Sequence, residues 1–60
     1  MIRLDRKTKC YTDGKNYAHS SQIRAYAIEN MGAKRQPGRL SREVIAAYFL
    51  DVFNVNEEVA

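Results

Sequence analysis

The sequence predicts a mainly α fold with a small N-terminal β element: a β-hairpin, then two roughly perpendicular helices joined by a long basic loop. Three observations predict it. Residues 1–19 alternate apolar and polar side chains around an Asp-Gly turn, two later segments space their apolar side chains as helices do, and a Pro-Gly pair separates them. Sixty residues make a single small domain (1–60) with a marginal core, because so short a chain buries only about 60% of its unfolded surface.

The β element is predicted from alternation and turn residues in residues 1–19. Ile2 and Leu4 alternate with charged residues, and Asp13-Gly14 is typical of a two-residue hairpin turn. A competing turn lies at residues 5–8. Both turns together would give a three-stranded meander, whose register the sequence alone does not define.

The first helix is predicted to follow this element directly. Ser20 or Ser21 is the expected N-cap, and Gly32 is the expected residue just past the helix end, where glycine enters the left-handed region cheaply. The apolar side chains at helical spacing are Ile23, Tyr26, Ala27 and Met31.

The second helix is predicted to begin after Ser41 as its N-cap, with Glu43 in the first turn where the helix dipole favours an anion. Its apolar stripe consists of Val44, Ile45, Tyr48, Phe49 and Val52. The helix-loop-helix module therefore spans residues 20–53, and residues 54–60 are expected to be a frayed tail.

Apolar side chains beyond this stripe predict self-association. Leu50, Phe53 and Val55 exceed what one contact between two small helices can bury, and the strand edges of residues 2–18 add a second surface for association. We therefore expect a homodimer or a larger protein partner. The alternative is a monomer whose second helix frays after Val52.

The charges are segregated along the chain. The net charge is +3, but all ten Lys and Arg residues lie in residues 1–42, which carry +7, whereas residues 43–60 carry −4. A basic front and an acidic back favour an anionic partner on one side, and nucleic acid is the commonest such partner.

Several function classes are not supported by the sequence. Cys10 is the only cysteine and His19 the only histidine, so no disulfide or structural zinc site is expected, and no nucleophile–base spacing indicates an enzyme. We expect no cofactor, metal or small-molecule substrate. No apolar run approaches the length of a membrane span and no targeting signal is recognisable, so a cytoplasmic protein is predicted.

The basic loop contains the features expected of a minor-groove ligand. Glycine removes the Cβ that would strike the groove wall, proline keeps the chain extended, and arginine offers a slim planar cation to the narrow, negative groove of A·T-rich DNA. The alternative is a solvated loop whose proline only stops a helix. The candidate DNA-binding residues are Lys34, Arg35, Gln36, Pro37, Gly38, Arg39, Arg42 and Arg24.

Residues 21–48 resemble the C-terminal DNA-binding domain of the Lsr-type actinobacterial silencers, which are functional counterparts of the H-NS nucleoid proteins. Residues 23–27 (IRAYA) match the first block of that family with tyrosine in place of tryptophan, residues 38–40 (GRL) match the end of its Arg-Gly-Arg block, and residues 43–48 (EVIAAY) match its last block. Pro37 stands where the first arginine of the hook is expected.

The resemblance implies two near-perpendicular helices and insertion of an AT-hook-like loop into A·T-rich minor groove. It further implies a nucleoid-associated regulator of transcription that takes part in xenogeneic silencing, either as a silencer or, as a phage protein, as the antagonist of a host silencer. The same helix-loop-helix pattern also resembles the peripheral subunit-binding domain of 2-oxo-acid dehydrogenase complexes, which binds protein through basic residues. This protein-binding module is the alternative function.

Overall fold

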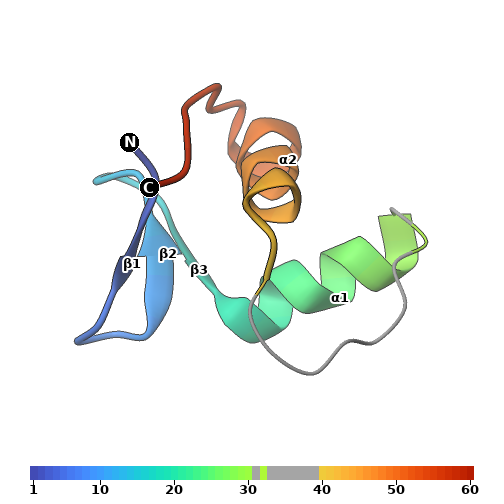
Figure 1. Cartoon of the computed structure of the whole chain (residues 1–60), viewed down its shortest axis with the longest axis horizontal. Helices are drawn as coiled ribbons and strands as arrows, with labels where there is room; N and C mark the ends of the chain where they lie inside the picture. Colours follow the sequence, from blue (N-terminus) through green and yellow to red (C-terminus); the bar gives the residue numbers. More distant parts are fainter. Residues whose placement is uncertain (31, 33–39) are drawn as a thin grey trace.

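The structure is a computed structural model that describes residues 1–30, 32 and 40–60. Three strands, β1 (Arg3–Asp5), β2 (Cys10–Thr12) and β3 (Tyr17–His19), form an antiparallel sheet in that order. Two helices follow, α1 (Ser20–Asn30) and α2 (Arg42–Phe53). In Figure 1, α1 is seen from the side and α2 close to end-on, so the two helices cross steeply beside the sheet.

The prediction of a mainly α fold is therefore confirmed for the two helices and wrong about the proportion of helix to strand. The sheet has three strands instead of the two of a hairpin, because the turn after Asp5 forms as well as the turn after Thr12. In the first turn the Asp5 carboxylate accepts a 3.0 Å hydrogen bond from the backbone N–H of Lys7, and Lys9 adopts a left-handed φ of 58°. The fold is accordingly α+β.

The second turn is a four-residue loop, and the expected two-residue turn at Asp13-Gly14 is not formed. The loop closes at the Thr12–Tyr17 pair. The Asp13 carboxylate accepts hydrogen bonds from the backbone N–H groups of Asn16 at 2.7 Å and Lys15 at 2.8 Å. These donors favour the ionised form, and they lower the pKa of Asp13 to about 2.

Helix α1 begins at Ser20, which is one residue earlier than a Ser20 cap and two residues earlier than a Ser21 cap would place it. His19 Nδ1 accepts from the backbone N–H of Ser21 at 3.2 Å, and Gln22 Oε1 accepts from the backbone N–H of His19 at 2.9 Å. This is the reciprocal pattern of a capping box with histidine in place of serine. Beyond the helix, Gly32 has a φ of +65°, as predicted for the residue past the helix end.

Helix α2 has the N-cap that the sequence predicts. Ser41 is extended (φ −72°, ψ 153°), and its side chain accepts from the backbone N–H of Val44 at 3.2 Å. At the other end Asn54 is left-handed (φ 57°), and its N–H and that of Val55 both point to the carbonyl of Phe49. Asparagine tolerates this conformation better than most residues.

The core lies where the sheet, both helices and the C-terminal segment meet. Its buried members are Ile2, Ala18, Ile23, Ile45, Tyr48 and Phe49. The Tyr48 ring packs edge-on against Tyr26 at 5.3 Å and against Phe53 at 5.9 Å between ring centroids, so it joins the two helices. The Tyr26 hydroxyl also donates to Asp51 Oδ2 at 3.0 Å.

The prediction of a frayed tail at residues 54–60 is wrong. The backbone N–H of Ile2 donates to the carbonyl of Glu58, and the N–H of Ala60 donates to the carbonyl of Ile2, both at 2.8 Å. The resulting parallel bridge joins Ile2 to Val59. The tail is held because it supplies backbone partners to Ile2 at the edge of the sheet and because its valines pack on the core.

The structure also changes the expected self-association surface. Phe53 and Val55 pack against the core of their own chain, so they are not surplus apolar surface. Of the three predicted residues only Leu50 is strongly exposed, at 49%. The expected homodimer thus loses two of the three side chains on which it was based.

Candidate nucleic-acid interface

Six of the eight predicted DNA-binding residues lie outside the described residues. They are Lys34, Arg35, Gln36, Pro37, Gly38 and Arg39. The structure does place Arg24 and Arg42, and it places the residues that flank the basic loop.

Both flanks of the loop are fixed points of the fold. On one side α1 ends at Asn30 and Gly32 is left-handed. On the other side Leu40 is partly buried against the core, and Ser41 is held by its hydrogen bond to Val44. Arg39 therefore immediately precedes an anchored residue, and such anchoring reduces the conformational entropy that a binding side chain loses.

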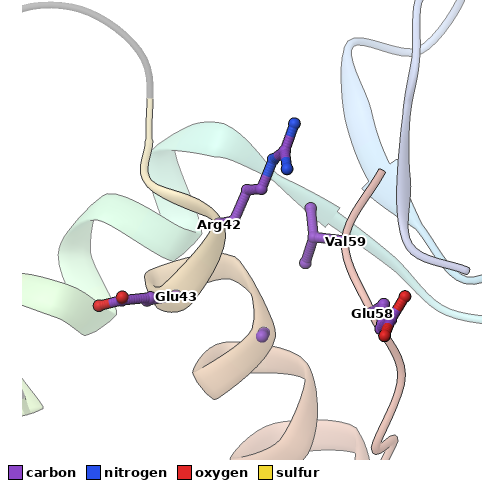
Figure 2. A pocket seen from close by; sticks show the side chains of 5 residues that line it. Arg42, Glu43, Glu58 and Val59 are labelled. Carbon is purple, nitrogen blue, oxygen red and sulfur yellow. The ribbon is translucent and has the colours of Figure 1, made fainter.

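Arg42 is the first residue of α2 and is exposed. It lines an open hollow of about 330 Å³ together with Glu43, Ala46, Glu58 and Val59. Figure 2 shows Arg42 and Val59 extending into the space between α2 and the tail, whereas Glu43 extends from the other side of the helix. The only ion pair among the described residues joins the Met1 amine to Glu57, so neither glutamate of the hollow pairs with Arg42.

Arg24 lies in the first half of α1 and is half-buried. It follows Ile23, which is fully buried in the core. Arg24 and Arg42 thus lie on the two helices that flank the basic loop, one on each.

The sequence interpretation missed a second group of cations, which lies around the sheet. The group consists of Arg3 on β1, Arg6, Lys7 and Lys9 in the turn after β1, and Lys15 in the loop after β2, and all five residues are exposed. The signal was present in the composition, because residues 1–19 alone carry a charge of +3 and the remaining forty-one residues sum to zero.

The described part of the chain shows no cluster of three His, Cys, Asp or Glu side chains that would hold a metal ion. Neither α1 nor α2 is long and apolar enough to cross a membrane. Cys10 is a half-buried free thiol whose sulfur lies 3.5 Å from the carbonyl oxygen of Thr8.

Comparison with known proteins provides no family for the chain. No protein-family model matches it, and no match was found among curated proteins or solved structures.

Proposed function

We propose that this chain is a small DNA-binding protein that inserts the Gly38–Arg39 segment into the minor groove of A·T-rich duplexes. It acts in the cytoplasm on the nucleoid, without catalysis, as a silencer-like regulator or as the antagonist of a host silencer. The proposal rests on the resemblance of residues 21–48 to the Lsr-type domain and on the charge pattern.

The observation that supports the proposal best is that the two residues directly after Arg39 are held by the fold. Leu40 packs on the core and Ser41 caps α2, so Arg39 is one residue away from a rigid point, and Arg42 begins the helix three residues after Arg39. A duplex would meet Arg39 in the groove and Arg42 on the phosphate backbone, which is the usual division between positioning and recognition.

The test is a titration of two labelled duplexes of equal length, one A·T-rich and one G·C-rich, by fluorescence anisotropy. We expect tighter binding of the A·T-rich duplex, and we expect Arg39→Ala to lose about 1–3 kcal/mol of binding free energy on it. Arg39→Lys is the control, because it keeps the charge and removes the planar guanidinium. Equal affinity of Arg39→Ala and wild type would contradict the hook.

The salt dependence separates this function from the protein-binding alternative. With about four phosphate contacts the slope of log K against log salt should be near −3.6. A flat salt response with no preference between the duplexes would favour the peripheral-subunit-binding type of module.

A further inference from the structure

We propose that the outer face of the three-stranded sheet is a second duplex-binding surface, which lies against the major groove and its flanking phosphates. The surface consists of Arg3, Tyr17 and His19 on the strands and of Arg6, Lys7, Lys9 and Lys15 in the two turns. One chain then holds two duplex segments, and this last consequence alone rests on the proposed function of the loop.

The strand pairing defines which side of the sheet is free. Leu4, Tyr11 and Ala18 are paired across the three strands; Ala18 is buried and Tyr11 packs against the core. Alternate strand residues point to opposite faces, so the neighbours of Ala18 face outward. On this outward face Tyr17 is 53% exposed and His19 is exposed, whereas Thr12, which pairs with Arg3 and Tyr17, is buried; on the opposite face Leu4 is 49% exposed.

The charge of this region is unbalanced in favour of an anionic partner. Residues 1–19 contain five exposed cations and two aspartates, and they account for the whole net charge of the chain. Both carboxylates accept hydrogen bonds from backbone N–H groups within their own turns: Asp5 from Lys7, and Asp13 from Lys15 and Asn16. Within the described residues, none of these five cations of residues 1–19 forms an ion pair.

The dimensions of the sheet match a duplex groove. The two basic turns lie at opposite ends of β2, because the strands are antiparallel, and Figure 1 shows them at opposite ends of the sheet. A strand of three residues is about 10 Å long and three strands are about 10 Å wide. The major groove is about 12 Å wide and admits a two-stranded β-ribbon, so two of the strands fit into it while the turns reach the phosphates on its two walls.

The turn between β1 and β2 lies away from Arg42. In Figure 1 this turn projects at the far side of the sheet from the start of α2, where Arg42 lies. A duplex bound at this turn and a duplex bound at Arg42 would therefore be different segments.

The test compares two triple variants of the full chain with the same net charge. The sheet variant is Arg6→Gln/Lys7→Gln/Lys15→Gln; Lys9 is kept because of its left-handed backbone. The control variant is Leu50→Glu/Val52→Glu/Asn56→Asp, which adds three anions at exposed positions on α2 and the tail. Circular dichroism first establishes that both are folded.

Two measurements follow: anisotropy with one duplex, and capture of a labelled second duplex by protein on a bead-bound duplex. We expect the sheet variant to capture at least tenfold less of the second duplex, because the loss of three phosphate contacts reduces the salt slope by about 2.7. The control variant should lose clearly less. Equal losses in the two variants would overturn the proposal. Stronger binding of single-stranded DNA than of duplex by the wild-type chain, lost in the sheet variant, would also overturn it. Competition by polyglutamate as efficient as competition by duplex would overturn it too, because it would indicate an acidic protein partner.

Arg39→Ala keeps the two proposals apart. If the hook is wrong but the sheet surface is right, this variant binds like wild type while the sheet variant still loses affinity. If the hook is right and the sheet surface is wrong, the reverse holds.

Discussion

The sheet side and the α2–tail side of this small domain differ in what their side chains do. Around the sheet five of the eleven exposed residues are cations, and only Ile2 and Ala18 among the first nineteen residues are buried hydrophobic side chains. In α2, Ile45, Tyr48 and Phe49 are buried, and the charges of α2 beyond Arg42 and of the tail are all negative. The buried aromatic side chains are thus concentrated in one part and most of the described cations in the other.

This separation shows how sixty residues can combine a hydrophobic core with a surface of clustered cations. Clustered cations repel one another and destabilise a compact state. Here the aromatic cluster on α2 supplies the packing, while the acidic residues of the same part keep the net charge low. Variants that remove a core side chain, delete the end of the tail or change one charge test this division between the two regions.

The largest effect is expected from Phe49→Ala. Phe49 is fully buried, and its ring lies 5.2 Å from that of Phe53 and 6.0 Å from that of Tyr48. Removing a buried phenylalanine costs about 3–5 kcal/mol, which is most of the stability of so small a domain. Thermal unfolding followed by circular dichroism should show little folded protein at 37 °C. Leu50→Ala, at an exposed position of the same helix, is the matched control; similar melting of both variants would contradict the assigned core.

Removal of residues 58–60 should have the next largest effect. The deletion removes both hydrogen bonds to Ile2 and the packing of Val59 against the core. Two hydrogen bonds contribute about 1–3 kcal/mol together, so the free energy of unfolding measured by urea titration should fall by a similar amount. Glu58→Gln keeps the backbone and serves as the control. An unchanged midpoint in the truncated chain would mean that the tail does not stabilise the sheet.

These regions also differ in how far the sequence predicted them. Ser41 and Gly32 were predicted correctly, because caps depend on residue type and on a few neighbours along the chain. His19 was missed because Ser20 and Ser21 are commoner caps and lie beside it. The tail was mispredicted because its partner, Ile2, is at the other end of the sequence, and no local pattern encodes that bridge.

The candidate site divides in the same way. The residue types of the basic loop were enough to predict a minor-groove ligand. The role of its six central residues, 34–39, stays a prediction because they lie outside the described residues. The cations around the sheet were visible as charges, but their common surface depends on the register of β1 to β3, which is set by packing against Ala18 and Tyr11 and not by the turn sequences alone.

A smaller effect, dependent on pH, is expected from Asp13. Its folded-state pKa is about 2 against a reference of 3.8, so its ionised form stabilises the fold above the reference value. This contribution is lost as the pH falls through the folded-state pKa. Acid unfolding should therefore separate wild type from Asp13→Asn between about pH 4 and pH 2, and the two should respond alike between pH 5 and 8. An identical acid response would show that the loop hydrogen bonds to this carboxylate do not matter for stability.

The smallest effect is expected from Glu58→Gln, and it concerns the boundary between the two regions. Glu58 and Arg42 line the same hollow without forming an ion pair, so the glutamate places a negative charge beside the start of α2. This charge repels a phosphate that approaches Arg42, and dissolved salt screens the repulsion. Removing it should tighten binding of an A·T-rich duplex about twofold at low salt, and the gain should vanish above about 0.3 M salt, where the Debye length falls below 6 Å. Glu29→Gln is the matched control, because Glu29 is exposed near the end of α1 and does not line the hollow. An equal gain from both variants would attribute the effect to net charge, whereas a gain from Glu58→Gln alone would place the bound duplex next to Arg42.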